Sequence, residues 1–284
     1  MKRAGASLAL ALVASAACAG CSRSAVPSAP QADAAPRPVA LVAPDAAPAS
    51  ADTASAEAGS PEPSSIAADA SVEAGATPTP TPPPPSNGVY LGRKLARPMS
   101  HLGAAWLDRA GRDAVQRPEH VLDVAGARAG ARVCDFGAGS GYFTVHLARR
   151  VGPTGRVFAV DVQPEMLALL EQKLTRERLL NVTPVLANPS EPSLPAASVD
   201  LVLMVDVYHE LERPDLTMAQ LRAALAPGGR VVWVEYRAED PNVSIKPDHK
   251  MSLAQIRREA AAVGYRITQV DESLPQQRIV VLAP

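Results

Sequence analysis

No phenylalanine, tryptophan or tyrosine precedes Tyr90, and half of the chain's 28 prolines lie between Ser22 and Asn87. A segment so poor in large apolar side chains cannot bury enough surface to offset the entropy that its backbone loses on ordering. The sequence therefore predicts a disordered tether, rich in alanine, proline and serine, over residues 22–87. One folded domain is expected over residues 88–284.

The chain also lacks a large net charge and a cysteine framework. Its net charge is -1, and no clustered lysine and arginine residues offer the electrostatic footprint of a nucleic-acid-binding protein. Only 3 cysteines occur, and Cys134 stands alone in an apolar run, where a cysteine behaves as a small hydrophobic residue. The sequence thus gives no support for a nucleic-acid partner or a disulfide scaffold.

One apolar run, Ala4–Ala19, follows a short basic start. The run is too short and too rich in alanine for a transmembrane span, and it suits a signal peptide. The residues around Cys21 resemble a bacterial lipobox, although Cys18 stands where that motif usually has leucine. We therefore expect a lipoprotein-type signal peptide over residues 1–21 and a lipid anchor on Cys21 in the cell envelope, at the outer membrane or the periplasmic face. Cleavage after Ala19, an uncleaved anchor and a cytoplasmic location are the alternatives.

Strand and helix patterns alternate through the folded domain. Compact apolar runs predict strands at 131–136, 156–161, 182–186, 199–205, 230–236, 266–270 and 278–282. Helical spacing of apolar residues predicts helices at 118–125, 142–151, 163–179, 214–225 and 252–263. This alternation predicts an α/β fold, a doubly wound and mostly parallel sheet covered on both faces. Ligands bind such sheets at the carboxyl ends of the strands.

A glycine loop and an acidic residue follow the first two predicted strands of this sheet. Gly137, Gly139 and Gly141 come directly after the strand at 131–136. Their G-x-G-x-G spacing differs from the G-x-G-x-x-G that seats a dinucleotide pyrophosphate. Asp161 ends the next strand, where a carboxylate can accept hydrogen bonds from both ribose hydroxyls. The alternative is that Asp161 only caps the helix that begins near Gln163.

These features together resemble the class I S-adenosylmethionine-dependent methyltransferases over most of residues 95–284. Residues 133–143 (VCDFGAGSGYF) look like the first motif of the family, and residues 225–229 (LAPGG) look like the turn before its fifth strand. Within the family, the ubiquinone-biosynthesis-like small-molecule enzymes are the most similar. The resemblance implies a Rossmann-like seven-stranded sheet with a C-terminal antiparallel hairpin strand, and S-adenosylmethionine as cofactor. It places the cofactor against Asp135, Gly137, Gly139, Gly141, Asp161, Val162, Asn188 and Asp206, with Asn188 standing where the family commonly has aspartate.

The acceptor of the methyl group is expected beyond the strand at 199–205. His209 could act there as a general base, which is needed only if the acceptor must lose a proton. Tyr208 could position the acceptor, and the alternative for both residues is a passive place in the pocket wall. The spacing of His209 and His249 does not match a metal-ligand motif, so no metal is expected.

Two further segments are candidates for contact with a small-molecule substrate. Glu235 and His249 flank a loop that is long for a simple connection, and such loops often carry specificity. The alternative is a solvated, charged loop. Trp106, in the segment before the first predicted sheet strand, could belong to a lid, although an aromatic residue packed on the domain edge is the common alternative.

Two functions remain open on the sequence alone. The first is an enzyme that transfers a methyl group to a small molecule. The second is a ligand-binding module that kept the cofactor pocket, which an exported protein would favour because S-adenosylmethionine is made in the cytoplasm. The glycine spacing excludes a third, a nicotinamide-dependent oxidoreductase.

Overall fold

The computed structural model of this chain describes residues 83–188 and 193–284. The predicted signal peptide, Cys21 and residues 22–82 of the predicted tether lie outside the described residues. Within the described part of the chain, no helix combines the length and the apolar character that a membrane crossing requires.

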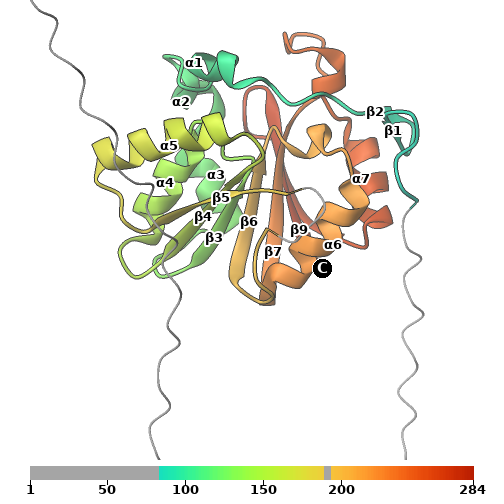
Figure 1. The fold of residues 1–284 in the computed structure, drawn as a ribbon. Coiled ribbons are helices and arrows are strands. Elements are labelled where there is room, and N and C mark those ends of the chain that lie inside the picture. Colours follow the sequence, from blue (N-terminus) through green and yellow to red (C-terminus); the bar gives the residue numbers. More distant parts are fainter. Residues whose placement is uncertain (1–82, 189–192) are drawn as a thin grey trace, which may run out of the picture. The chain divides into compact units, whose positions relative to one another are not determined.

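A seven-stranded sheet forms the centre of the folded domain (Figure 1). Its strand order is β5-β4-β3-β6-β7-β9-β8. The first five strands in this order are parallel, and β9 joins β7 and β8 in antiparallel pairs. This arrangement confirms the predicted Rossmann-like fold with its antiparallel C-terminal hairpin. The strands are β3 (Arg132–Phe136), β4 (Arg156–Asp161), β5 (Val182–Leu186), β6 (Val199–Val205), β7 (Leu225–Tyr236), β8 (Arg266–Asp271) and β9 (Gln277–Ala283).

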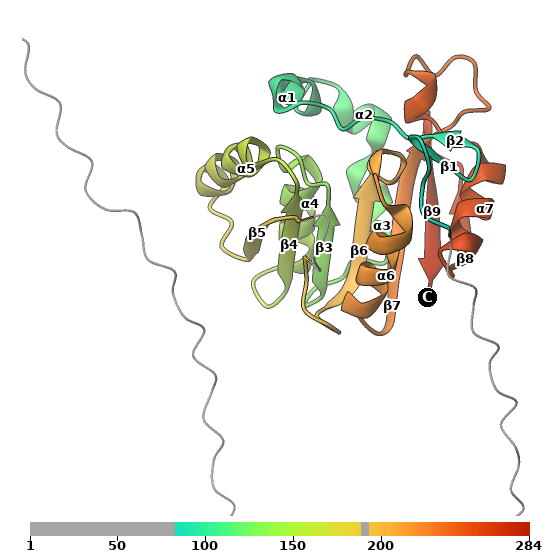
Figure 2. The ribbon, with the colours of Figure 1, turned by 45° about the vertical axis from the view of Figure 1, so that its right-hand side comes forward.

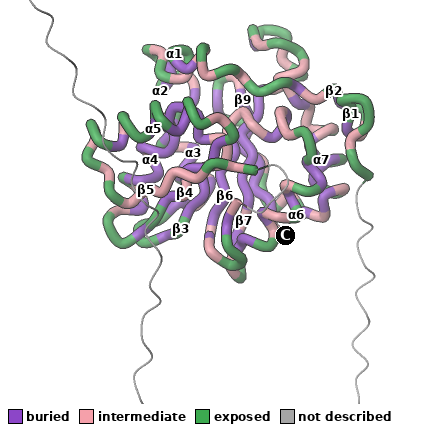
Figure 3. The backbone as a smooth tube through the Cα atoms, in the orientation of Figure 1, coloured by how far each residue is buried: buried purple, intermediate pink, exposed green. Residues whose placement is uncertain are grey.

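Helices cover both faces of the sheet (Figure 2). Successive residues of a strand point to opposite faces, so Val133 packs against α3 and α4 while Cys134 faces the core beneath α6 and α7. The buried residues form a continuous layer along the strands (Figure 3). The helices α3 (Pro118–Ala125), α4 (Tyr142–Val151) and α5 (Pro164–Glu177) lie on one face, and α6 (Pro214–Ala224) and α7 (Leu253–Ala262) lie on the other.

The turn expected at residues 225–229 is built into β7. Val199 pairs with Leu225 and Leu201 with Arg230, so the intervening residues form a bulge in the strand. Gly228 has a positive φ of 76° there, a conformation that glycine adopts without steric cost. The strand therefore starts earlier than the apolar run that begins at Arg230.

The segment before α3 forms short elements that the sequence patterns did not predict. A hairpin of β1 (Val89–Tyr90) and β2 (Arg93–Lys94) is followed by a 3-10 turn, η1 (His101–Gly103), and by the short helices α1 (Ala104–Leu107) and α2 (Arg112–Gln116). Residues 94–107, which we call the strap, cross the carboxyl ends of the parallel strands (Figures 1 and 2).

One buried ion pair anchors the hairpin that precedes the strap. Arg93 on β2 donates two hydrogen bonds to the carboxylate of Glu259 on α7, at 2.7 and 2.9 Å. It donates a third to the carbonyl oxygen of His209, at 2.9 Å. The side chain of Glu259 is fully buried. Losing one partner of such a pair leaves a buried charge without compensation.

We predict that Arg93→Ala lowers the free energy of unfolding by about 3–5 kcal/mol, because it isolates the Glu259 carboxylate in the interior. Urea denaturation followed by circular dichroism measures this loss. The double variant Arg93→Met with Glu259→Leu removes both charges and should recover most of it. A single variant as stable as the parent chain would show that the pair does not anchor the hairpin.

Candidate active site

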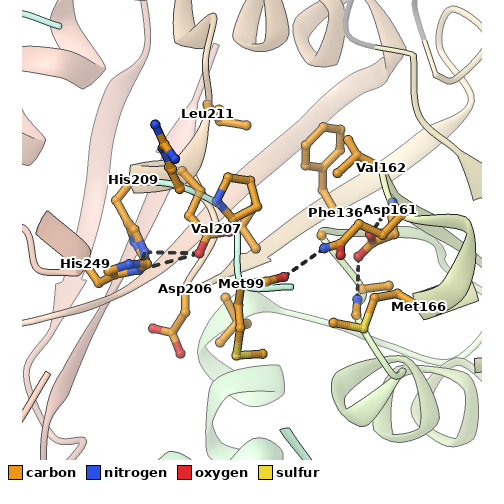
Figure 4. A pocket seen from close by; sticks show the side chains of 18 of the residues that line it. Met99, Phe136, Asp161, Val162, Met166, Asp206, Val207, His209, Leu211 and His249 are labelled. Carbon is orange, nitrogen blue, oxygen red and sulfur yellow. Dashed lines mark hydrogen bonds and ion pairs between the residues drawn. The ribbon is translucent and has the colours of Figure 1, made fainter. Parts of the chain in front are cut away.

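A cavity of about 1170 Å³ opens at the carboxyl ends of β3, β4 and β6. This is the edge at which open parallel sheets bind ligands. Its walls come from the loops after these three strands, from the strap, and from the loop between β7 and α7. Figure 4 shows two groups of side chains well apart in the cavity, one around Asp161 and one around His209, with Met99 between them.

The glycine loop after β3 forms one wall of this cavity, which Gly137 and Gly139 line and Gly141, although expected beside the cofactor, does not. Gly137, Gly139 and Gly141 all have positive φ angles, of 78°, 53° and 85°. A Cβ atom at Gly137 would lie 2.3 Å from Val207, and one at Gly141 would lie 2.2 Å from Leu170. Both the backbone conformation and the close packing therefore require glycine at these positions.

Asp161 stands at the end of β4, beside this loop. One carboxylate oxygen accepts a hydrogen bond from the N–H of Gly139 at 2.7 Å, and the other accepts one from the N–H of Gln163 at 2.9 Å. Burial raises the pKa of Asp161, and these backbone donors partly offset the rise. The contact with Gln163 is of the capping kind expected on the alternative interpretation. Because each carboxylate oxygen can accept two hydrogen bonds, Asp161 keeps acceptor capacity toward the cavity that it lines.

Asp135, which is buried, and Asp206, which is half-buried, are two further carboxyl groups in the cavity wall. The hydroxyl of Thr144 donates to Asp135 at 2.6 Å. The side-chain amides of Gln116 and Gln277 donate to the two oxygens of Asp206, at 3.0 and 2.7 Å. Burial raises the pKa of each aspartate to about 6. Each group is held by neutral donors, which stabilise its charge less than a cation would.

His209 lies in the 3-10 turn η2 (Tyr208–Glu210) after β6, and only 1% of its surface is exposed. Its Nδ1 is 2.6 Å from Glu235, and its Nε2 is 3.1 Å from Nδ1 of His249. His249 comes from a second 3-10 turn, η3 (Pro247–His249). Burial acts to lower the pKa of His209, but the charge and hydrogen bond of Glu235, with smaller contributions from Glu210 and Asp206, raise it overall.

The side chain of Gln163 fastens the strap to the start of α5. The Gln163 amide donates to the carbonyl oxygen of Met99 at 2.9 Å, and its oxygen accepts from the N–H of His101 at 2.9 Å. Met99 thereby lies over the cavity between Asp161 and His209 (Figure 4).

Comparison with known proteins agrees with this geometry. The family model described as a methyltransferase domain matches residues 133–229, which run from β3 to the bulge of β7. A solved S-adenosylmethionine-dependent methyltransferase from Aquifex aeolicus superposes with a TM-score of 0.62 at 26% sequence identity, and the match covers 65% of this chain and 98% of that one. Residues 133–229 carry a methyltransferase domain, and the fold is that of the class I S-adenosylmethionine-dependent enzymes.

The curated relatives match over a shorter stretch than the solved structure does. The ubiquinone/menaquinone biosynthesis C-methyltransferase UbiE of Hydrogenovibrio crunogenus is 30% identical over 118 residues, which is 41% of this chain and 46% of that protein. The UbiE protein of Cupriavidus necator is 34% identical over 116 residues, 39% of this chain and 46% of that protein. The chain therefore spans less than half the length of these relatives.

S-adenosylmethionine is the cofactor of this methyltransferase domain, and the side chains around Asp161 suit it. The carboxylate of Asp161 can accept from ribose hydroxyls, while Val162 and Met166 offer apolar surface beside it. Asn188 lines the same cavity, and Val162 is 48% exposed. The cofactor contacts expected for Asp161, Val162 and Asn188 stay predictions, made for residues that line the cavity.

Two residues expected to contact the acceptor do not line the cavity of the methyltransferase domain. Tyr208 is fully buried and stacks on Trp233, with ring centroids 3.7 Å apart. Glu235 is fully buried behind His209. The placement of Tyr208 does not fit acceptor positioning, and Glu235 can act only through His209. Trp106 and His249 do line the cavity, as a lid residue and a substrate contact would.

Sequence patterns missed the glutamine side chains that hold Asp206 and the strap. Gln116, Gln277 and Gln163 contact their partners across 90, 71 and 64 residues of sequence. A glutamine in a short helix, in a hairpin strand or directly before a helix carries no motif that indicates such a partner. For one of these contacts the sequence offers an indication of place, because Gln163 follows Asp161 by two positions and so lies near the expected cofactor site.

The raised pKa of Asp135 leads to a prediction on pH-dependent stability. The Asp135 carboxyl has its ordinary pKa, near 4, in the unfolded chain and a pKa of about 6 in the folded protein. Between these pH values the folded state binds more protons than the unfolded state. The free energy of unfolding therefore falls as pH rises. Between pH 4 and pH 7.5 the ionisation of Asp135 should lower the free energy of unfolding of the parent chain by on the order of 2–3 kcal/mol, and Asp135→Asn should lack this decrease.

Urea denaturation at several pH values measures the difference between the two proteins. Asp123→Asn, at an exposed position on α3, is the matched control and should leave the pH profile unchanged. A constant difference between the parent chain and Asp135→Asn across this pH range would contradict the burial of an ionisable group there.

Proposed function

We propose that the domain transfers a methyl group from S-adenosylmethionine to a small-molecule acceptor held between the strap and His209. The observation that carries this proposal is the continuity of one cavity from Asp161 to His209 and His249. Its volume of about 1170 Å³ exceeds the roughly 300–1,000 Å³ of ordinary ligand pockets. The cavity therefore has room for a second molecule beside the cofactor.

The residues of this chain would act mainly by binding and orientation. The bound cofactor supplies a methyl group that its sulfonium has already activated. Asp161 fixes the cofactor through its ribose, while the strap and Val207 cover the middle of the cavity. Holding two molecules in line and excluding water can account for much of a rate enhancement.

The geometry favours a place in the pocket wall for His209 over general-base catalysis. A base would use Nε2, since Nδ1 is engaged by Glu235. That nitrogen faces Nδ1 of His249 at 3.1 Å and Oε1 of Glu210 at 3.9 Å. An acceptor proton would have to reach it past these two side chains.

The names of the relatives support a small-molecule acceptor without specifying it. The UbiE proteins are named as C-methyltransferases of quinone biosynthesis, and the match covers less than half of their length. We therefore extend only the class of acceptor to this chain. A ligand-binding module on the same fold is the second candidate, favoured by the proposed export of the chain.

Calorimetric titration of the purified chain with S-adenosylmethionine tests the first requirement of this function. We expect micromolar binding, weakened about 100-fold or more in Asp161→Ala, because hydrogen bonds to a charged group contribute about 1.5–3 kcal/mol each. Asp161→Asn is the milder variant, and Asp123→Ala on the surface is the matched control. Circular dichroism should show each variant folded.

The outcomes separate the two candidate functions. Absence of cofactor binding to the folded parent chain would exclude methyl transfer and leave the ligand-binding module. Binding that is unchanged in Asp161→Ala would remove Asp161 from the cofactor site. Binding lost in Asp161→Ala and kept in Asp123→Ala supports the proposed enzyme.

We further propose that the chain is a lipoprotein tethered to the bacterial envelope through Cys21 and residues 22–87. The support comes from the sequence alone: a basic start, the apolar run Ala4–Ala19, and small residues before Cys21. This location separates the domain from the cytoplasmic source of its cofactor. A cytoplasmic location is the alternative.

Fractionation of cells that produce the full chain tests the lipid anchor. We expect the parent protein in the membrane fraction and Cys21→Ser outside it, because the serine hydroxyl cannot form the thioether to lipid. Cys18→Ser is the matched control and should stay with the membranes. Equal distribution of the parent and Cys21→Ser would contradict lipidation at this position.

A further inference from the structure

Three potential metal-binding atoms converge at the His209 end of the cavity. Nε2 of His209 lies 3.1 Å from Nδ1 of His249 and 3.9 Å from Oε1 of Glu210. The third side of this triangle, from His249 Nδ1 to Glu210 Oε1, measures 3.5 Å. His209, Glu210 and His249 form the group of histidine, cysteine and acidic residues that could hold a metal ion among the described residues.

The size of this triangle fits a cation at its centre. Nitrogen and oxygen ligands bind zinc at about 2.0–2.1 Å, so two ligands of a tetrahedral zinc lie about 3.4 Å apart. The three measured sides bracket this value. Small rotations of Glu210 and His249 would make the three sides equal, since these side chains are partly exposed, at 17% and 22%.

The most buried of the three residues also has the outer partner of a metal ligand. Glu235, which is fully buried, accepts a hydrogen bond from Nδ1 of His209 at 2.6 Å. A metal-binding histidine almost always donates its second ring N–H in this way, often to a carboxylate, and the contact turns the other nitrogen toward the ion. The Nε2 lone pair of His209 is thus directed at His249 and Glu210.

The charges around the triangle favour a cation. Glu210, Glu235 and Asp206 bring three carboxyl groups close to the two imidazole rings. Within residues 83–188 and 193–284, no lysine or arginine forms an ion pair with any of the three carboxyl groups. Arg93, Arg112 and Lys246 act on this cluster without forming an ion pair with these carboxyl groups, whereas a divalent ion between the rings would contact Glu210 directly.

The backbone holds the three side chains in place from two separate turns. The N–H of Glu210 donates to the carbonyl oxygen of Val207 at 2.9 Å, and the N–H of His249 donates to that of Lys246 at 3.0 Å. These bonds close the 3-10 turns η2 and η3. The spacing of 40 residues between the two histidines explains why no ligand motif is visible in the sequence.

We infer that His209 Nε2, His249 Nδ1 and Glu210 Oε1 bind one divalent transition-metal ion of the zinc type. Two imidazoles and one carboxylate suit zinc and its neighbours in the periodic table, whereas magnesium and calcium prefer oxygen ligands throughout. Three protein ligands leave a coordination position open, as in catalytic zinc sites. All three residues line the cavity, so this position faces the space proposed for the acceptor.

Metal titration of the purified chain tests this inference. The chain is stripped with a chelator and titrated with Zn²⁺ by calorimetry and with Co²⁺ by visible absorption. Cys18 and Cys21 are replaced by serine in every protein, because their C-x-x-C spacing could bind zinc by itself. We expect one ion per chain, and cobalt absorption bands typical of four or five nitrogen and oxygen ligands.

Variants of the two partly exposed ligands locate the ion. His249→Ala and Glu210→Gln should each weaken Zn²⁺ binding at least about 10-fold, and Glu235→Gln should weaken it about 10-fold to 100-fold through His209. His146→Ala, which removes a histidine on α4, is the matched control and should bind as the parent does. Circular dichroism confirms that each variant is folded.

Two results would overturn the inference. The parent chain could bind no stoichiometric ion, and the cluster would then be a hydrogen-bonded pair of histidines beside carboxyl groups. Alternatively, His249→Ala and Glu210→Gln could bind as tightly as the parent, which would place the ion elsewhere. The titration uses neither cofactor nor acceptor, so either result leaves the proposed methyl transfer to its own test.

Discussion

The parallel direction of β4, β3, β6 and β7 brings their carboxyl ends to one edge of the sheet, and an acidic side chain lies at or next to each of these ends. The four residues are Asp161, Asp135, Asp206 and Glu235. A buried carboxylate is unstable without donors, because it has exchanged water for an interior of low polarity. The groups around the cavity provide these donors. They come from a hydroxyl, from backbone N–H groups, from glutamine amides and from an imidazole.

The kind of donor divides the cavity into two chemically different ends. Asp161 is held by backbone N–H groups of the glycine loop and of Gln163, so its position does not depend on side chains from distant segments. Asp206 and Glu235 depend on side chains from α2, β9 and η2. The first end is therefore rigid and local, as suits a cofactor common to a whole family. The second end draws on many segments of the chain, as suits recognition of a particular acceptor.

The same division explains how much the sequence revealed. The bounds of α4, β4, β5 and β6 agree with prediction because apolar runs and flanking glycine or proline residues mark them locally. Asp161 and the glycine loop were found for the same reason. The pattern after β6 located His209 and Tyr208 but could not show that Tyr208 turns into the core against Trp233. The meeting of His209 with His249 depends on tertiary contacts between two turns, and neither turn has a periodicity that could be read in advance.

Both hydrogen bonds between the strap and the Gln163 side chain use main-chain atoms of the strap, the carbonyl oxygen of Met99 and the N–H of His101. Hydrogen bonds of this kind do not depend on the side chains of the strap, since every residue has a carbonyl group and all except proline have an N–H. Substitutions along the strap can therefore change the surface that meets an acceptor while the fastening beside Asp161 stays the same. In evolutionary terms, the fold separates a part that is free to diversify from the part that binds the cofactor.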